Sequence, residues 1–276
     1  MGLRAGQGTV MIRKARQQTR KTLLQIQARL HARAQSRYAQ DLSFTAAAKR
    51  FPDRSEMYRY MYHYFHNLAP QALREHRTYF SQEGRGFGED AFHAMWFTLL
   101  REFKPRTCLE IGVYRGQTIS LWGLVSKLIG FDCDLHGISP FSSAGDEASR
   151  YSENVDYLTD TQQSFRKFSA KIPRLVKAYS TDPQARAHIA AHSWDMIYID
   201  GSHDYEIVLA DYEICRDHLA PGGLLVMDDS SLYTDYRPPL FGFAGHPGPS
   251  RVLRDFAMKE LRFLGAVGHN NVLCKE

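Results

Sequence analysis

From about residue 90 onward, short apolar runs alternate with longer segments whose apolar positions recur every three or four residues. The short runs predict buried strands, because a strand covered on both faces is apolar along most of its length. The longer segments predict helices. We expect strands at 107–111, 133–138, 175–178, 194–200, 224–227, 261–267 and 271–274. We expect helices at 55–69, 90–103, 117–129, 162–172, 184–191, 205–219 and 250–260.

Strands that alternate with helices predict an α/β fold: a doubly wound, Rossmann-like, mostly parallel sheet with right-handed crossovers. The last two expected strands have no helix between them, so one antiparallel edge strand is expected. Pro221-Gly-Gly223 predicts a turn, and 142–160 a long polar loop. We divide the chain into an N-terminal arm at 1–48, a helical cap segment at 49–89 and an α/β domain at 90–276.

The charge is unevenly distributed along the chain. Residues 1–40 hold nine Lys or Arg and no acid, whereas the remaining residues carry 26 basic and 30 acidic side chains, a net charge of −4. Apolar residues recur at helical spacing within 12–38, namely Leu23, Ile26, Leu30 and Ala34. This extension either binds a membrane surface or an anionic polymer, or is a solvated helix that packs on the body or on a second subunit of a homo-oligomer.

Composition favours a soluble globular protein, with 43% hydrophobic and 24% charged residues. No apolar run reaches 18 residues and the N-terminus lacks the apolar centre of a signal peptide, so we expect a cytoplasmic protein, peripheral at the membrane if the arm binds one. No two of the four cysteines form a Cys-x-x-Cys motif, which indicates that the cysteines are reduced residues of the core.

One strand-loop-helix stretch, 107–118, is the clearest candidate for ligand binding. The strand ends near Glu110, Gly112 and Gly116 bracket a turn, and Thr118 lies in the first turn of the expected helix. Glycines at such a turn let a ligand lie against bare backbone near the helix N-terminus. The pattern differs from the dinucleotide motif Gly-x-Gly-x-x-Gly.

Polar residues gather where the expected strands end. In an open parallel sheet, ligands bind beyond the carboxyl ends of the strands. The residues at that edge are Glu110, Ser139, Ser180, Asp182, Asp200, Asp228 and Asp229. Five carboxylates at one edge repel one another unless a cation or hydrogen-bond donors compensate.

Asp200, Asp228 and Asp229 follow neighbouring strands, so three carboxylates can meet in one coordination sphere. Oxygen ligands suit Mg²⁺ or another hard divalent cation. His203 lies three residues after Asp200, and its ordinary pKa of ~6.5 suits a general base near neutral pH. A purely structural role for His203 stays open.

Four stretches together carry a family resemblance: the glycine loop with its preceding acid, Ile-Asp-Gly-Ser-His-Asp-Tyr at 199–205, Pro-Gly-Gly at 221–223, and Asp-Asp at 228–229. Over about 90–276 the chain resembles class I S-adenosylmethionine-dependent methyltransferases, and among them the Mg²⁺-dependent sugar O-methyltransferases of the macrolide-sugar tailoring type. The resemblance implies S-adenosylmethionine binding through Glu110, Gly112, Gly116, Thr118, Ser139, Ser180 and Asp182. It also implies metal ligands at Asp200, Asp228 and Asp229, with His203 and Asp200 as catalytic residues.

One position departs from the family pattern. The second strand commonly ends in an acid that binds the cofactor's ribose, and Ser139 stands there instead. We expect either that Asp146 or Glu147 from the following loop substitutes for it, or that the cofactor binds more weakly. The aromatic residues of 57–65, or alternatively Tyr233, Tyr236, Phe241 and Phe243, are expected to line the acceptor pocket.

The expected activity is therefore methyl transfer to a hydroxyl of a sugar, another small molecule or a glycan, with S-adenosylmethionine as donor and a divalent metal assisting. Two other functions stay open. A nucleic-acid methyltransferase is favoured by the basic arm, but the fourth strand does not end in the Asn-Pro-Pro-aromatic sequence of enzymes that methylate amino groups of bases. The other possibility is a function without methyl transfer: either a scaffold that binds cofactor without catalysis, or a non-methylating relative of the cephalosporin-hydroxylase type.

Overall fold

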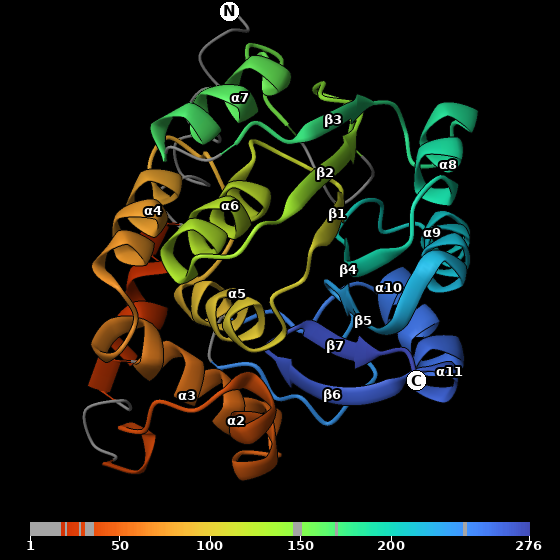
Figure 1. Ribbon diagram of the computed structural model, residues 1–276. Helices are drawn as coiled ribbons and strands as arrows, with labels where there is room; N and C mark the ends of the chain where they lie inside the picture. The colour runs from red at the N-terminus through yellow and green to blue at the C-terminus, as the bar shows by residue number, and fades with distance from the viewer. Residues whose placement is uncertain are drawn as a thin grey trace, which may run out of the picture.

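The computed structural model describes residues 18–19, 21–27, 29–30, 36–145, 151–168, 171–239 and 242–276. A seven-stranded sheet in the order β3-β2-β1-β4-β5-β7-β6 runs through its centre (Figure 1). The strands are β1 (Thr107–Ile111), β2 (Asp134–Ser139), β3 (Arg174–Lys177), β4 (Trp194–Ile199), β5 (Leu219–Met227), β6 (Arg262–Val267) and β7 (Asn270–Cys274).

The predicted doubly wound sheet is confirmed. Strands β1 to β5 are parallel, with β2 and β3 on one side of β1 and β4 and β5 on the other. The strand order therefore reverses between β1 and β4, where open α/β sheets bind ligands. The antiparallel strand is β7, which pairs with both β5 and β6 and so lies one place in from the edge.

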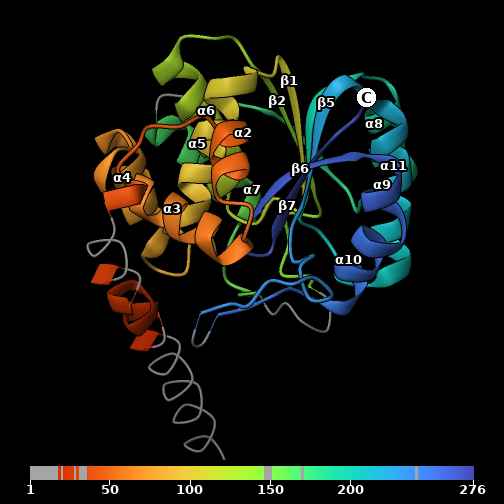
Figure 2. The same ribbon diagram turned by 90° about the horizontal axis from the view of Figure 1, so that it is seen from below.

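Helices cover both faces of the sheet. In Figure 2, α2 to α7 lie on one side of the strands and α8 to α11 on the other. The first group is α2 (Phe44–Arg50), α3 (Arg54–Asn67), α4 (Gln71–Ser81), α5 (Asp90–Phe103), α6 (Gln117–Ile129) and α7 (Tyr157–Lys167). The second is α8 (Pro183–Ala190), α9 (Tyr205–His218), α10 (Pro247–Val252), the π-helical turn η2 (Leu253–Ala257) and α11 (Met258–Glu260). A short 3₁₀ turn, η1 (Ser36–Tyr38), precedes α2.

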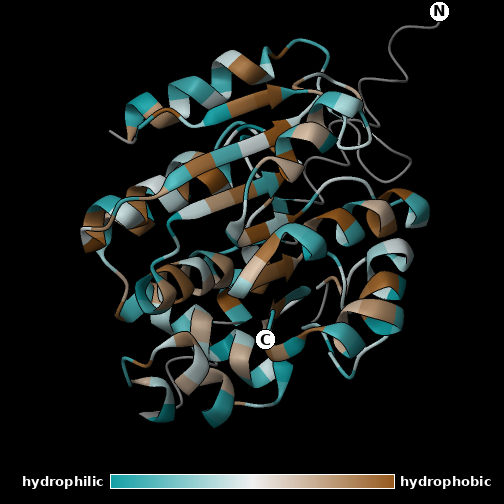
Figure 3. Cartoon of the chain, turned by 45° about the vertical axis from the view of Figure 1, so that its right-hand side comes forward, coloured by the Kyte–Doolittle hydropathy of each residue, from teal (hydrophilic) through white to brown (hydrophobic). Residues whose placement is uncertain are grey.

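Alternation along the strands builds two cores. Cys108 and Tyr198 face the helices on the α5 and α6 side, whereas Leu109 and Ile197 face the α8 and α9 side. Apolar residues accordingly dominate the strands in Figure 3. The ring of Tyr198 packs edge-on against Trp96, with ring centroids 4.9 Å apart. Strands buried on both faces explain why their sequence is nearly continuously apolar.

The aromatic residues of α3 belong to the core. Tyr60 and Tyr64 are fully buried, and the Tyr64 hydroxyl donates a hydrogen bond to Asp41 at 2.8 Å. Helix α3 packs on α5 and β6. No residue of 57–65 lines the large cavity at the carboxyl edge of the sheet. These aromatic residues therefore do not form the walls of an acceptor pocket there, which was one of the two expectations.

Several element boundaries differ from the predictions. Helix α7 begins at Tyr157, inside the expected polar loop, because the Asp156 carboxylate accepts a hydrogen bond from the Thr159 N–H and caps it. The helix expected at 250–260 begins at Pro247. Helices α2 and α4, of seven and eleven residues, were not predicted.

The turn expected at 221–223 is instead part of β5. The Gly222 N–H donates to the Lys275 carbonyl oxygen at 2.8 Å, and the Lys275 N–H donates to the Gly223 carbonyl at 3.0 Å. Pairing with the end of the chain thus draws this stretch into the sheet. The prediction was wrong because a Pro-Gly-Gly stretch carries no local sign of a distant partner.

Within the described residues, no helix has both the length and the apolar character that crossing a bilayer requires.

The contact between Gly112 and the end of β4 yields a stability prediction. A Cβ on Gly112 would lie 1.8 Å from the Asp200 carbonyl oxygen, and the Gly112 φ is +102°. Gly112→Ala should lower the free energy of unfolding by at least about 4 kcal/mol or prevent folding. Urea denaturation followed by circular dichroism measures this.

Gly130→Ala is the matched control, because Gly130 also has a positive φ (+77°) but no atom within 4 Å of an added Cβ. It should cost only about 1–2 kcal/mol, the strain of the left-handed conformation. Equal losses in the two variants would contradict the close contact at Gly112.

Candidate functional site

The glycine loop after β1 is pressed against the end of β4. The Asp200 N–H donates to the Ile111 carbonyl at 2.9 Å, and only the absence of a side chain at Gly112 permits this approach. Gly116 has a φ of +81° and begins α6, where a Cβ would come within 2.9 Å of Thr161. Both glycines are therefore required by packing within the protein, whether or not a ligand is bound.

A first cavity, of about 210 Å³, opens beyond the ends of β1, β2 and β4. Its walls are largely apolar and aromatic, with serine hydroxyls among them. Among the residues that line it are Gly112, Tyr114, Ser139, Phe141, Tyr157, Ser180 and Asp200.

A second and larger cavity, of about 850 Å³, adjoins the first. Five residues line both: Gly112, Tyr114, Tyr151, Asp200 and Gly201. The larger cavity combines acids and imidazoles with aromatic rings, including Glu110, Phe92, Trp96, His203, Asp228, Asp229, Phe243, His246 and His269.

Most of the predicted site residues meet at these cavities. Ser139 and Ser180 line the first, and Glu110, Thr118, His203, Asp228 and Asp229 line the second, while Gly112 and Asp200 line both. Gly116 and Asp182 line neither. The Asp182 carboxylate instead accepts a hydrogen bond from the Tyr179 N–H at 2.9 Å, the role of a turn former.

Ser139 shapes the turn after β2. Its hydroxyl accepts a hydrogen bond from the Phe141 N–H at 3.4 Å, and Phe141 adopts a positive φ of +46°. The acids expected to replace a ribose-binding carboxylate, Asp146 and Glu147, lie outside the described residues, as does Phe241.

Glu110 is almost fully buried at the floor of the larger cavity. Burial raises the pKa of its carboxyl to about 8; the Ile119 N–H opposes the shift and the charge of Asp228 adds to it. Its Oε2 has no hydrogen-bond partner among the described residues. A buried, unpartnered carboxylate oxygen at a cavity suits a ligand that brings a positive charge or hydrogen-bond donors.

Asp200 and Asp228 face one another at the ends of β4 and β5. Burial, then the neighbouring charge of Asp228, raises the pKa of Asp200 well above its ordinary value. Two carboxyl groups in contact cannot both ionise easily, so this pair favours holding a proton or binding a cation.

Asp229 stands in an opposite environment, between two imidazoles. His203 Nε2 lies 2.9 Å from its Oδ2, and His269 Nδ1 lies 2.8 Å from its Oδ1. Although burial opposes it, these contacts hold the pKa of Asp229 well below its ordinary value. Asp229 is therefore ionised.

His269 supplies positive charge that the sequence analysis did not find. Its Nδ1 is also 2.9 Å from Asp228 Oδ1, and despite burial the two carboxylates raise its pKa well above the ordinary value. His269 lies in the turn between β6 and β7, beyond every motif considered above. The only feature that points to His269 is its position. It lies in the hairpin between β6 and β7, and β7 pairs with β5.

Two groups of metal-ligating atoms share Asp229. One is His203, Asp229 and His246, the other Asp228, Asp229 and His269; within each group the candidate ligand atoms lie within 4.8 Å of one another. Asp200 belongs to neither group, although it contacts Asp228. The geometry thus gathers carboxylates with imidazoles instead of the all-oxygen triad that was expected.

The arm approaches the same site. Residues 21–27 are helical, the Tyr62 hydroxyl donates to the Gln25 carbonyl at 3.1 Å, and Lys21 and Leu24 line the larger cavity. Packing against the body is therefore one of its roles. Leu23 and Ile26 remain about half exposed, so a further partner for the arm stays a prediction.

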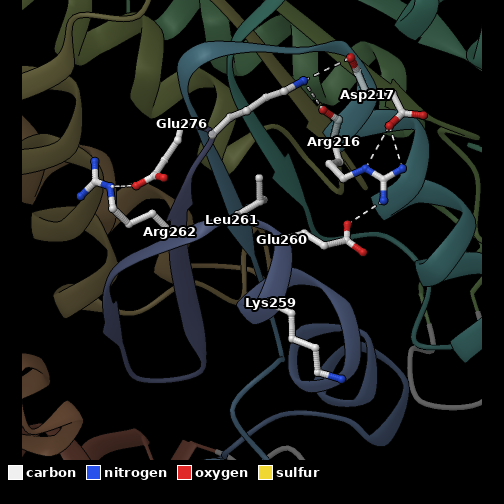
Figure 4. Close-up of a pocket in the computed structure, with 8 residues that line it drawn as sticks. Arg216, Asp217, Lys259, Glu260, Leu261, Arg262 and Glu276 are labelled. Carbon is white, nitrogen blue, oxygen red and sulfur yellow. Dashed lines mark hydrogen bonds and ion pairs between the residues drawn. The ribbon is translucent and has the colours of Figure 1, made fainter.

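A hollow at the opposite end of the sheet has a different character (Figure 4). Its charges are engaged with one another: Arg216 pairs with Glu260 at 2.6 Å, Arg262 pairs with Glu276 at 3.3 Å, and the Lys275 ammonium donates to the Arg216 carbonyl. Most of the charged groups that line this hollow are therefore already paired with one another.

Comparisons with known proteins agree on the kind of domain. Residues 109–230 match a family model described as a methyltransferase domain. An uncharacterized protein of Acanthamoeba polyphaga mimivirus is 29% identical over 133 residues, 48% of this chain and 53% of that protein. The chain thus spans about half the length of this curated relative.

Solved structures show the same fold at low identity. A methyltransferase of Podospora anserina, solved with S-adenosylhomocysteine, is 14% identical with a TM-score of 0.52, covering 75% of this chain and 88% of that one. An O-methyltransferase of Bacillus cereus, also in complex with S-adenosylhomocysteine, is 12% identical with a TM-score of 0.51, covering 77% and 95%.

A buried acid beside the first cavity gives a pH prediction. Burial raises the pKa of Asp211 to about 6, while a hydrogen bond from Ser180 and the charge of Arg186 oppose the shift. Because the folded pKa exceeds the unfolded value of about 3.9, the stability from this group is full below pH ~4 and is lost as pH rises through ~6. Asp211→Asn should remove this dependence.

Relative to the parent, Asp211→Asn should gain about 3 kcal/mol in unfolding free energy between pH 4 and pH 7, the equivalent of roughly two pKa units. Urea denaturation at both pH values measures it, with the exposed Asp132→Asn as control. A parent-to-variant difference that is constant across this interval would contradict the shift.

Proposed function

The chain contains a methyltransferase domain of the class I fold, and we propose that this domain transfers a methyl group from S-adenosylmethionine to a hydroxyl of a sugar, another small molecule or a glycan, assisted by a divalent cation. The observation that carries the proposal is the junction of the two cavities at Asp200 and Gly201. A donor in one cavity and an acceptor in the other would meet there.

The first cavity suits the donor. Its apolar and aromatic walls match an adenine ring, and Ser139 and Ser180 place hydroxyl groups along it that a ribose could contact. The unpartnered Oε2 of Glu110 lies at the neighbouring cavity, where the ammonium group of the methionine end would compensate its charge. The Podospora and Bacillus proteins of the same fold were solved with the product form of this donor.

The second cavity suits an uncharged, polar acceptor. Phe92, Trp96 and Phe243 offer rings against which a sugar can stack, and carboxylates can accept hydrogen bonds from its hydroxyls. Its acids would repel the phosphates of a nucleic acid. This charge distribution favours a sugar-like acceptor over a nucleic acid, in spite of the basic arm.

The acceptor hydroxyl must lose its proton during the transfer. The contact between His203 Nε2 and the Asp229 carboxylate orients the imidazole, as an acid orients the histidine of a catalytic triad. His203 would take the proton on its imidazole ring. The nearby apolar walls would exclude water from the transfer.

The residues present fit a divalent cation. Asp228 and Asp229 both line the larger cavity, and both ligand groups contain the ionised carboxylate of Asp229. Asp228 and Asp229 would hold the cation, with Asp200 beside them. Because the His246 imidazole stands beside the carboxylates, the site suits Mn²⁺, Fe²⁺ or Zn²⁺ as well as Mg²⁺. A bound cation would lower the pKa of an acceptor hydroxyl and help to position it.

The direct test is to incubate the protein with S-adenosylmethionine labelled in its methyl group, a divalent cation and fractionated cell glycans and metabolites. Label in a sugar fraction would support the proposal. Calorimetric binding of S-adenosylmethionine without label transfer to any fraction would favour a cofactor-binding scaffold. Label in nucleic acid would show that the acceptor is a nucleic acid and not a sugar.

His203 can be tested separately from cofactor binding. His203→Gln should lower the methyl-transfer rate by roughly 10²–10⁴-fold, the usual contribution of a positioned general base. S-adenosylmethionine affinity, measured by calorimetry, should stay near that of the parent. His218→Gln, at the opposite edge of the sheet, is the control, and a near-parental rate in His203→Gln would make His203 a structural residue.

Metal removal tests the cation. EDTA should abolish methyl transfer, and Mg²⁺, Mn²⁺ or Zn²⁺ should restore it. The ion that restores it best indicates whether oxygen atoms alone, or oxygen atoms together with an imidazole, bind the metal. Asp228→Asn should require at least tenfold more cation for half-maximal activity, whereas the exposed Asp132→Asn should match the parent. Full turnover in EDTA would exclude the metal and leave acid-base catalysis alone.

A further inference from the structure

Three histidines form a cluster far from both cavities. His136 lies in β2, His188 in the last turn of α8, and His192 one helical turn later, just before β4. Helix α8 runs against the strand direction, so its C-terminal end lies at the edge of the sheet opposite the candidate active site (Figure 1). The proposed methyl transfer uses none of these residues.

The three rings converge on one point. Their candidate ligand nitrogens all lie within 4.8 Å of one another, and His136 Nδ1 is 2.9 Å from His188 Nε2. Zn–N bonds of 2.0–2.1 Å in a tetrahedral site separate the nitrogens by about 3.3 Å. The His136–His188 pair would have to open by a few tenths of an ångström, and a wider pair would have to close by up to about 1.5 Å. His188 and His192 have the i, i+4 spacing that places two ligands on one helical face.

Outer contacts orient two of the three rings toward that point. His136 Nε2 lies 3.1 Å from the Asp134 carboxylate, which leaves Nδ1 for the cluster. His192 Nδ1 contacts the His188 carbonyl at 2.9 Å, which leaves its Nε2. The Trp194 ring packs against both His136 and His192, with centroids 4.8 Å apart. Carboxylate and carbonyl partners of this kind support metal-binding histidines.

Burial favours the neutral form of the His136 and His188 imidazoles. Burial, then the neighbouring rings, lowers the pKa of His188 to about 4, and burial lowers the pKa of His136 although Asp134 opposes the shift. Neutral imidazole is the form that binds metals, so no proton must leave these two rings at neutral pH. The nearby Arg174 guanidinium would repel a cation, but it pairs with the Asp134 carboxylate at 3.4 Å, and this pairing offsets the repulsion.

We propose that His136, His188 and His192 bind a divalent transition-metal ion of the Zn²⁺ class, with solvent as the remaining ligand. Imidazole donors suit Zn²⁺, Ni²⁺ or Cu²⁺ and not Mg²⁺. His136 is fully buried whereas His188 and His192 are half-buried, so the site is closed on the sheet side and open to water on the other. The ion would tie β2 to the connection between α8 and β4.

The test uses Co²⁺ as a spectroscopic probe and first removes the other ligand groups. Asp229→Asn disrupts both groups at the candidate active site, because they share this carboxylate. In that background the protein should bind one equivalent of Co²⁺, with visible absorption typical of nitrogen ligands and displaced by Zn²⁺. Zn²⁺ should also raise its melting temperature. Adding His188→Gln or His192→Gln should weaken binding at least tenfold and abolish both signals.

His218→Gln is the matched control, since His218 ends helix α9 and contacts the Ile214 carbonyl at 2.9 Å as His192 contacts that of His188. In the Asp229→Asn background it should bind Co²⁺ like its parent. Metal-free circular dichroism and melting curves confirm that the half-buried variants fold. Unchanged Co²⁺ affinity in folded His188→Gln and His192→Gln variants would overturn the proposal, and this outcome is independent of methyl transfer.

Discussion

Buried negative charge at the carboxyl edge of the sheet is the constraint that organises this molecule. Asp200, Asp228 and Asp229 stand within contact distance of one another or of shared partners, where their mutual repulsion and desolvation oppose folding. Two responses are built into the structure. Asp200 has a raised pKa, so it can hold a proton, whereas Asp229 stays ionised between His203 and His269. The position of β7 between β5 and β6 is what brings His269 to this edge.

The same arrangement prepares the chemistry we propose. Carboxylates and imidazoles that compensate one another are also the groups that bind a cation, orient a base and accept the hydrogen bonds of a hydroxylated acceptor. Glu110 has the corresponding role for the methyl donor. Burial raises its pKa and its Oε2 has no partner among the described residues, so a cationic ligand would stabilise its ionised form. The arm adds Lys21 and Leu24 to the acceptor cavity, so residues remote in sequence help to define its shape.

The two edges of the sheet differ in their ligand chemistry. The carboxyl edge mixes oxygen and nitrogen donors around two adjoining cavities, whereas the opposite edge offers three imidazoles. A metal at the second place would stabilise the join between β2 and the α8–β4 connection without touching either substrate. In our two proposals, residues at one edge of the sheet serve catalysis and residues at the other serve structure.

The sequence by itself determined the α/β class, the strand succession, the glycine loop and most residues at the cavities, because periodicity and strand-end acids are local signals. Tertiary structure alone decided which groups meet. Gly112 contacts Asp200, and Asp229 pairs with His269, across long stretches of chain that carry no local mark of the pairing. The Pro221–Gly223 stretch became strand for the same reason, through Lys275. Contacts between distant segments depend on how whole elements pack, and that information is spread over the entire fold.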